Sequence, residues 1–351
     1  MQLNNTSRAQ NAAPRRFRTT AERPLAFLRH CPVYEPTPLR DLDSLAGALG
    51  VAALYAKDET RRMGLGSFKA LGAAFAVAQM IAEAAGTTDL ESEAARRAAA
   101  GMTFITASAG NHGLSLAAGA KVFGAKAVIV LSATVPEAFA ARIRALGAEV
   151  LRVDGSYDYS VATAIRTAVR NGWLLLADGS WEGYTERPAL VMEGYMVLAE
   201  ECRADFAERG EWPTHVFLQA GVGGLAAALA AQIREAWAEQ PEIIVVEPEA
   251  APCLIASVEA GCLTRAEGPD SNMGRLDCKE ASLIAFEALR GDADRFVTVT
   301  DAEAQAAADL LADHGIATTP SGAAGLAALQ AQPPGPDSRC LIVVSEGPEE
   351  S

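Results

Sequence analysis

The sequence passes, at Met102-Thr103-Phe104-Ile105-Thr106-Ala107-Ser108-Ala109-Gly110-Asn111-His112-Gly113, from an apolar run into a turn of small residues. The first five residues predict a buried strand, and the turn after them predicts the start of a helix. Backbone N–H groups of small residues can approach a carboxylate or phosphate there, and a helix N-terminus favours the anion. The stretch therefore predicts an anion site, although a plain turn with a packed His112 would give the same pattern.

The same alternation of short β-branched runs and amphipathic helical stretches continues along most of the chain. It predicts an α/β fold with parallel sheets flanked by helices. The expected strands are largely apolar, which suits strands covered on both faces. They are Leu54–Lys57, Met102–Thr106, Ala127–Leu131, Glu149–Val153, Trp173–Leu176, His215–Gln219, Ile243–Glu247, Phe296–Val299 and Leu341–Val344. Thr300 and Glu303 are spaced as a capping box and predict a helix that stops at Gly315.

Length and charge restrict the function. A chain of 351 residues exceeds the usual size of one domain, so we expect a larger domain from residues 21–74 and 187–351 and a smaller one from residues 75–186. The net charge of -14, with no basic stripe, speaks against nucleic-acid binding, which needs clustered Lys and Arg. No run of about 18 apolar residues predicts a membrane span.

The N-terminus and the cysteines bear on location. Residues 1–20 hold four Arg and no acid, which favours a disordered basic tail over an organelle transit peptide. The six cysteines are scattered, with no CxxC pair and no His at ligand spacing. This pattern predicts no metal site and favours a reducing, cytoplasmic environment.

A lysine follows a glycine-rich turn at Gly64-Leu65-Gly66-Ser67-Phe68-Lys69-Ala70-Leu71-Gly72. A lysine that enters a helix in this way lies near positive helix-end potential and apolar neighbours. Both favour the neutral amine that covalent chemistry with a carbonyl group requires. Most lysines are solvated surface charges, so Lys69 is a candidate only together with the other segments.

Another turn of small residues, Ala220-Gly221-Val222-Gly223-Gly224-Leu225, follows the expected strand His215–Gln219. Its glycines allow backbone N–H groups to approach and bind a phosphate. With Ala226, however, the segment also satisfies the GxGxxA dinucleotide pattern, in which Glu247 would bind the ribose. On this segment alone a nicotinamide-dependent oxidoreductase stays open.

Together these segments resemble the tryptophan-synthase-β family, the fold type II enzymes that use pyridoxal 5'-phosphate (PLP). The resemblance is carried by Ser67–Gly72, Ser108–Gly113 and Gly221–Leu225, and it extends from Tyr34 to Gly347. It implies a two-domain enzyme in which Lys69 binds the cofactor covalently. A nicotinamide enzyme has no need of the lysine segment or of the loop at Ser108, so the ensemble favours PLP.

The resemblance also implies roles for individual residues. The cofactor would be contacted by Lys69, Phe68, Asn111, Gly221, Val222, Gly223, Gly224, Leu225 and Ser345. The substrate carboxylate would be bound by Ser108, Ala109, Gly110, Asn111 and His112. Ser345 would bond the pyridine nitrogen, with Ser321 as second candidate. A hydroxyl partner leaves that nitrogen unprotonated, which fits β-elimination better than transamination.

Further segments resemble the diaminopropionate ammonia-lyases within this family. Asp178-Gly179-Ser180-Trp181-Glu182-Gly183-Tyr184 looks like the DxxWEGY signature, Met192–Tyr195 resembles the segment after it, and Ser271–Glu280 is loosely similar. Core packing of the aromatic residues and a helix cap at Asp178 are the plain alternatives. The resemblance implies that a small amino acid such as L-2,3-diaminopropionate is converted to pyruvate and ammonia, with Lys69 and Asp178 as catalytic residues.

Ala109 departs from the ammonia-lyases, which carry an aspartate there that is thought to take the α-proton of the D-enantiomer. With alanine, Lys69 is the evident base, so we expect L-substrates and a role for Asp178 in recognising or protonating the leaving group. Ala109 also makes the loop similar to that of dehydratases, so a serine, threonine or hydroxyaspartate dehydratase stays open, as does a non-catalytic ligand-sensing relative. The expected ligand is a small amino acid, and the resemblance implies a homodimer.

Overall fold

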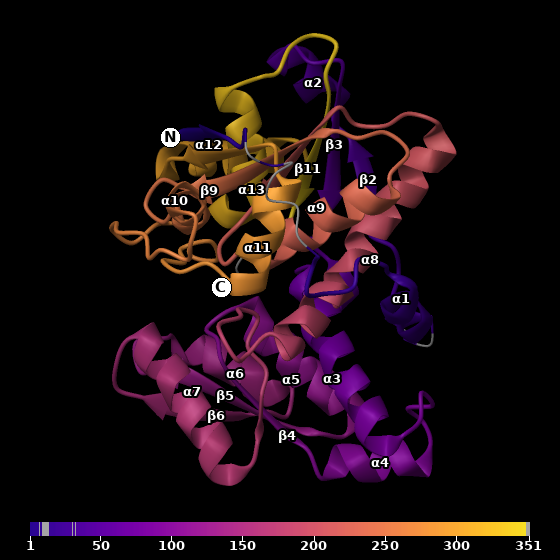
Figure 1. The fold of residues 1–351 in the computed structure, drawn as a ribbon, viewed down its shortest axis with the longest axis vertical. Helices are drawn as coiled ribbons and strands as arrows, with labels where there is room; N and C mark the ends of the chain where they lie inside the picture. The colour runs from indigo at the N-terminus through magenta and orange to yellow at the C-terminus, as the bar shows by residue number, and fades with distance from the viewer. Residues whose placement is uncertain (7, 9–13, 30, 32, 349–351) are drawn as a thin grey trace. The chain divides into compact units, whose positions relative to one another are not determined.

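The computed structural model describes residues 1–6, 8, 14–29, 31 and 33–348 (Figure 1). The chain forms two compact units. Unit 1 consists of Met1–Phe68, Gly179–Thr185 and Tyr195–Ser351, and unit 2 consists of Lys69–Asp178 and Glu186–Gly194. Each unit contains its own sheet, as expected of an α/β chain of this length.

Unit 1 contains a seven-stranded sheet in the order β1-β10-β9-β8-β11-β3-β2. The five inner strands are parallel, and β1 and β2 pair antiparallel at the two edges. The strands are β1 Gln2–Asn4, β2 Leu39–Asp41, β3 Ala53–Asp58, β8 His215–Gln219, β9 Glu242–Pro248, β10 Arg295–Val299 and β11 Arg339–Val344. Its helices are α1 Glu22–Leu28, α2 Asp43–Leu49, η2 Arg62–Gly64, α9 Gly224–Ala236, α10 Cys253–Ala260, α11 Leu283–Asp292, α12 Asp301–Asp313 and α13 Pro320–Ala331.

Unit 2 contains a four-stranded, fully parallel sheet in the order β6-β5-β4-β7. Its strands are β4 Thr103–Ala107, β5 Lys126–Ser132, β6 Glu149–Val153 and β7 Leu174–Leu175. Its helices are α3 Lys69–Ala85, α4 Glu93–Ala100, α5 Asn111–Phe123, α6 Glu137–Ala145 and α7 Tyr157–Asn171. Helix α8, Glu186–Arg209, begins in unit 2 and continues into unit 1.

The inner parallel strands of unit 1 are buried on both faces, which explains their largely apolar sequence, whereas β6 of unit 2 is partly exposed along its length. In unit 1 the residues Ile244 and Val246 of β9 are fully buried, as are Ile342 and Val344 of β11. They pack with residues of α12 and α13 in one apolar cluster. Because side chains on both faces are apolar, the polar groups of this unit concentrate at the strand ends, where the loops begin.

The strands predicted from sequence are confirmed, each to within two residues, and the capping box at Thr300 is present at the start of α12. Sequence patterns missed β1 and β2, which have three residues each and carry no periodic signal. Both are short antiparallel edge strands, so their formation depends on the exposed backbone of the neighbouring strand.

The expectation of a disordered tail at residues 1–20 is wrong for several of the described residues. Gln2–Asn4 pairs with β10, and Phe17 is buried at 8% exposure. Arg15 forms an ion pair of 2.7 Å with Asp292. Unpaired backbone groups on β10 and an apolar ring account for this order. Residues 7 and 9–13 of the same segment lie outside the described residues.

The bounds of the units differ from the expected domain bounds. Unit 2 begins at Lys69 rather than at residue 75, because the whole of α3 packs in that unit. Gly179–Thr185 belongs to unit 1, whereas Glu186–Gly194 belongs to unit 2. In the described part of the chain, no helix is both long and apolar enough to cross a membrane.

Candidate active site

The segment before Lys69 is held against the end of strand β11. The N–H of Phe68 donates to the carbonyl of Ser345 at 3.1 Å, and the N–H of Gly347 donates to the carbonyl of Gly66 at 2.9 Å. Gly66 has a φ of 74°, a backbone conformation that glycine adopts without strain. The turn therefore ends in a fixed position, and Lys69 follows as the first residue of α3.

Lys69 and Asp178 form an ion pair within unit 2. The Nζ of Lys69 lies 2.5 Å from Oδ2 of Asp178, and both side chains are about three-quarters buried, at 21% and 25% exposure. Burial alone would raise the pKa of Asp178, but the charge of Lys69 holds it well below its usual range. An ionised carboxylate therefore lies beside the amine that sequence analysis singled out.

The first turns of α3 are fixed by close contacts inside unit 2. The hydroxyl of Ser115 donates to the carbonyl of Lys69 at 2.6 Å. A Cβ on Gly194 would lie 2.5 Å from the carbonyl oxygen of Leu71, so only glycine allows α8 to approach this closely. These contacts fix the helix turn that carries the lysine.

His112 is buried at 3% exposure in α5. Its Nε2 lies 2.8 Å from the carbonyl oxygen of Leu176, which requires Nε2 to carry the hydrogen. Burial lowers the pKa of His112, so the ring is neutral near pH 7. Its Nδ1 finds no hydrogen-bond partner among the described residues.

The loop Ser108–Gly113 between β4 and α5 is closed by its own serine. The hydroxyl oxygen of Ser108 accepts from the N–H of Gly110 at 3.3 Å and from the N–H of Gly113 at 3.1 Å. A Cβ on Gly113 would lie 2.8 Å from the carbonyl oxygen of Ser108. Asn111 begins α5, and Ala109 brings no acid to the loop.

The glycine-rich loop Ala220–Leu225 in unit 1 joins β8 to α9 and is enclosed by neighbouring backbone. A Cβ on Gly221 would lie 3.1 Å from both the carbonyl oxygen of Arg275 and the Sγ of Cys278. Gly223, with a φ of 94°, is the N-cap of α9. The N–H groups of this turn therefore form a compact donor set at a helix N-terminus, where a phosphate binds favourably.

The two candidate serines for the pyridine nitrogen differ in their bonding. The Oγ of Ser321 accepts from the backbone N–H of Arg275 at 3.1 Å. Ser345 is 5% exposed as a residue, its carbonyl accepts from Phe68, and its hydroxyl forms no hydrogen bond with the described residues. A ligand atom can therefore bond the Ser345 hydroxyl without displacing a protein partner.

The segment after Asp178 forms a closed turn in unit 1. Trp181 and Tyr184 exchange backbone hydrogen bonds of 3.2 and 2.9 Å, and their rings stack with centroids 4.4 Å apart. Ser180 bonds Ser282, with 2.7 Å between the two hydroxyl oxygens. Packing thus explains the aromatic residues, while Asp178 remains available as a charged group.

Glu247 does not act as a ribose-binding acid. Its side chain is fully buried, and its two carboxylate oxygens accept from the N–H groups of Leu254 and Ile255 at 2.7 and 2.9 Å. With both oxygens engaged by helix α10, no oxygen faces a nucleotide. Glu247 is therefore not the ribose-binding acid of the dinucleotide pattern, which argues against a nicotinamide-dependent oxidoreductase.

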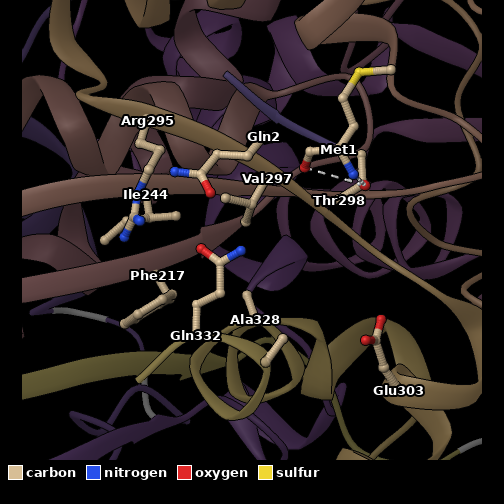
Figure 2. Close-up of a pocket in the computed structure, with 11 residues that line it drawn as sticks. Met1, Gln2, Phe217, Ile244, Arg295, Val297, Thr298, Glu303, Ala328 and Gln332 are labelled. Atoms are coloured by element: carbon tan, nitrogen blue, oxygen red, sulfur yellow. Dashed lines mark hydrogen bonds between the residues drawn. The ribbon is translucent and has the colours of Figure 1, made fainter. Parts of the chain in front are cut away.

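A cavity of about 350 Å³ lies in unit 1, away from every residue predicted to bind cofactor or substrate. Figure 2 shows its apolar wall of Phe217, Ile244 and Val297 and, beside it, the amino group of Met1 that donates to the hydroxyl of Thr298 at 2.5 Å. The hydroxyl of Thr298 and the carboxylate of Glu303 in its wall are hydrogen-bonded to Met1 and Thr300. It is not a candidate for the reaction.

A buried ionic cluster that was not predicted from the sequence lies in the segment that leads to Lys69. Arg62 is fully buried and donates to both Glu59 and Glu201, at 2.7 Å each. Lys57 pairs with Glu201 at 2.7 Å. The charged residues at the end of an otherwise apolar strand were a signal for this cluster, but Glu201 lies too far along the chain to be assigned from spacing.

Comparison with known proteins shows to which family the chain belongs. Residues 31–346 match the family model described as pyridoxal-phosphate dependent enzyme. The chain belongs to this family. Diaminopropionate ammonia-lyase of Escherichia coli strain K12 is 37% identical over 309 residues, which cover 85% of this chain and 77% of that relative. The biosynthetic L-threonine dehydratase of the same strain is 31% identical over 87% of this chain, but the match covers 54% of that relative.

A solved structure supports the fold as well as the family. The crystal structure of E. coli diaminopropionate ammonia-lyase, in complex with an aminoacrylate-PLP azomethine reaction intermediate, superposes with a TM-score of 0.88. The identity is 32%, and the match covers 99% of this chain and 93% of that one. The predicted fold type II class is thereby confirmed, and the chain is a PLP-dependent lyase.

The residues present fit this cofactor. The loop of unit 1 has no room for a Cβ at Gly221 and offers its N–H groups at the start of α9, which suits a phosphate. The hydroxyl of Ser345 forms no hydrogen bond with the described residues, which leaves it for a ring nitrogen. Lys69 provides the amine that an aldehyde requires, although in the ion pair with Asp178 it is an ammonium ion, which must give up a proton before it bonds a carbonyl carbon.

Proposed function

We propose that this enzyme eliminates ammonia from the β-carbon of L-2,3-diaminopropionate and yields pyruvate and ammonia. The observation that carries the proposal is the pair of Lys69 and Asp178, 2.5 Å apart, in a chain related to diaminopropionate ammonia-lyases. The hydroxyl of a dehydratase substrate is uncharged and leaves as water after it takes up a proton, which an ionised carboxylate cannot donate. The structure of the E. coli relative with its reaction intermediate adds weight.

In this proposal Lys69 binds the cofactor covalently, and the residues of both glycine-rich segments hold it. Gly221, Val222, Gly223, Gly224 and Leu225 donate backbone N–H groups to the phosphate. Ser345 bonds the pyridine nitrogen in preference to Ser321, and Phe68 and Asn111 contact the ring. When bound, PLP delocalises the electron pair that deprotonation leaves on the α-carbon of the substrate.

The amine of Lys69 removes the α-proton. We assign this role to Lys69 because the same amine binds the cofactor; the Nε2 hydrogen of His112 is donated to the carbonyl of Leu176. Ala109 brings no acid to the opposite side of the substrate loop. The enzyme therefore acts on the L-enantiomer, whose α-proton a single lysine can take.

Asp178 recognises the leaving group. Its ionised carboxylate pairs with the β-ammonium of the substrate, and the ammonium nitrogen leaves as ammonia with the electron pair of the broken C–N bond. The unsaturated product then takes up water to give pyruvate and a second ammonia. The loop Ser108–His112 binds the substrate carboxylate through its backbone N–H groups.

A panel of substrates tests this proposal. We expect release of pyruvate from L-2,3-diaminopropionate at a rate at least about tenfold above that of 2-oxo acid release from L-serine, L-threonine or 3-hydroxyaspartate. Asp178→Asn should narrow this difference, since an amide does not pair with an ammonium ion. A faster reaction with a hydroxyl substrate would overturn the ammonia-lyase assignment, and equal rates with D- and L-diaminopropionate would overturn the role given to Ala109.

A dehydratase is the second candidate, favoured by Ala109 in the substrate loop. In that case Asp178 would support loss of a hydroxyl group, and the same panel would rank L-serine or 3-hydroxyaspartate first. We also propose a cytoplasmic homodimer, on the basis of the family resemblance and the scattered cysteines. Sedimentation equilibrium at several protein concentrations measures the second property.

A further inference from the structure

Glu247 completes the N-terminus of helix α10 from a neighbouring strand. It lies near the end of β9, is fully buried, and accepts hydrogen bonds of 2.7 and 2.9 Å from the N–H groups of Leu254 and Ile255. The N-cap position of α10 is Pro252, which provides no side-chain cap. The carboxylate therefore takes the place of the missing cap and fixes the first turn of α10.

That first turn touches the glycine-rich loop. The Sγ of Cys253 donates to the carbonyl of Gly221 at 3.5 Å. A Cβ on Gly223 would lie 3.2 and 3.4 Å from the two Cδ atoms of Leu254. The loop therefore rests on side chains that belong to the turn capped by Glu247.

The loop Ala220–Leu225 is also held by backbone hydrogen bonds to other segments of unit 1. The N–H of Ala220 donates to the carbonyl of Val246 at 2.8 Å, so the start of the loop is bonded to β9, the strand that also carries Glu247. On another side, the N–H of Ser282 donates to the carbonyl of Val222 at 2.9 Å. Besides these backbone bonds, Cys253 and Leu254 support the loop from α10, while Arg275, Cys278 and Ala285 pack against it from other segments.

Burial of the Glu247 carboxyl group costs free energy of folding, which argues that the group has a structural role. Burial raises the pKa of Glu247 to about 8, while the two amide donors act in the opposite direction. A buried carboxyl without ion pairing persists where its hydrogen bonds hold a specific geometry. Helix α10 is the element held here.

We propose that Glu247 is a positioning residue for the cofactor phosphate, acting through α10 on the loop Gly221–Gly224. The inference rests on the proposed function, in which this loop binds the phosphate of PLP. Loss of the carboxyl group loosens the first turn of α10, and the N–H groups of the loop then converge less well on the phosphate. Binding of the pyridine ring, which depends on Lys69 and Ser345, is left unchanged.

The test compares PLP with pyridoxal, which lacks the phosphate. Enzyme freed of cofactor is titrated with each compound, and absorbance of the bound form gives the dissociation constants. Glu247→Ala should weaken PLP binding roughly tenfold, the effect of losing a helix cap, and leave pyridoxal binding unchanged. Glu247→Gln keeps one acceptor oxygen and should lose less, about threefold.

Glu303→Ala is the matched control, because Glu303 also accepts a helix-end N–H, at 2.7 Å from Thr300, but caps α12 and does not touch the loop. It should change neither constant. If Glu247→Ala does not fold, Leu254→Ala removes the side chain that packs on Gly223 and should give the same selective loss of PLP affinity.

Two results would overturn the inference: equal weakening of PLP and pyridoxal, which indicates a general structural role, or unchanged PLP affinity in Glu247→Ala and Leu254→Ala. Both leave the proposed function intact as long as borohydride treatment still yields a pyridoxyl adduct on Lys69. Absence of that adduct in the unmodified enzyme would instead overturn the proposed function.

Discussion

The loops Ser108–Gly113 of unit 2 and Ala220–Leu225 of unit 1 have the same plan and different supports. Each follows a parallel strand and opens a helix. The first is held by its own serine, whose hydroxyl accepts from two N–H groups of the loop. The second has no such side chain and is held by Cys253, Leu254, Arg275 and Cys278 from neighbouring segments.

This difference shows when the residues of a motif suffice to fix the conformation of a loop and when they do not. A loop closed by its own side chain depends on a few adjacent residues. A loop of glycines depends on residues that are 30 to 60 positions away in the chain, none of which belongs to the motif. Mutations outside the motif should therefore affect the loop of unit 1 more than the loop of unit 2.

The largest effect is expected from filling the space beside Gly221. Gly221→Val places methyl groups against the backbone of Arg275 and Leu276, which lie about 3.1 Å from a Cβ at this position. Overpacking of this kind costs about 3 kcal/mol, so PLP affinity should fall about 100-fold. Gly274→Val is the control, since no atom lies within 4 Å of its Cβ position. Equal PLP affinity in both variants would show that the loop does not need this enclosure.

A smaller effect is expected from Gly113→Ala in the self-supported loop. The new Cβ would lie 2.8 Å from the carbonyl oxygen of Ser108, so the loop must shift by a few tenths of an ångström. We expect kcat/KM for diaminopropionate to fall about 30-fold, equivalent to about 2 kcal/mol. Gly101→Ala, where the nearest atom lies at 3.5 Å, should leave kcat/KM unchanged. A normal kcat/KM in Gly113→Ala would contradict the close packing of the loop.

Removal of the Ser108 hydroxyl, which holds the loop Ser108–Gly113, should weaken substrate binding. Ser108→Ala deletes the acceptor of the Gly110 and Gly113 N–H groups, and the KM for diaminopropionate should rise about tenfold with a smaller change in kcat. Ser108→Thr keeps the hydroxyl and should restore most of the affinity. Steady-state kinetics of the two variants decide: if Thr is as poor as Ala, the hydroxyl is not what closes the loop.

The smallest effect is expected in the pH dependence of stability and comes from Glu247, which we propose supports the loop Ala220–Leu225. The pKa of Glu247 is raised to about 8 in the folded protein, above the usual value near 4.5. The folded chain thus binds more protons than the unfolded chain in this window, and stability from this group is lost as the pH rises towards 8. Glu247→Gln should remove a slope of at most about 1.4 kcal/mol per pH unit between pH 6.5 and 7.5.

Denaturant unfolding of the unmodified protein and of Glu247→Gln at those two pH values measures the slope. Other titrating groups contribute equally to both proteins, so the difference between the two slopes reports on Glu247. Parallel slopes would mean that burial does not perturb this carboxyl.

Much of the fold follows from the sequence because buried parallel strands are apolar without interruption. The buried strand β8, for example, has the bounds that were predicted. The edge strand β1 escaped prediction because it forms only against β10, nearly 300 residues away. The basic segment around Arg15 was read as solvated for the same reason, since its partner Asp292 is distant in sequence.

The candidate site could be predicted from the sequence only in part. Lys69 at the start of a helix and the two small-residue turns follow from local spacing. The distance between Lys69 and Asp178 does not, because it arises from the return of the chain after β7. Glu247 was assigned to a ribose by a pattern that gives its distance along the chain but not the direction of its side chain, which helix α10 determines.

The central claim is that the amine of Lys69 forms a covalent bond with PLP. Reduction of the purified enzyme with borohydride, followed by digestion and mass analysis of the peptides, tests it directly. The account predicts a pyridoxyl group on the peptide that contains Ser67-Phe68-Lys69, and no adduct in the Lys69→Ala variant. A pyridoxyl group on another lysine, or none on any peptide, would contradict it.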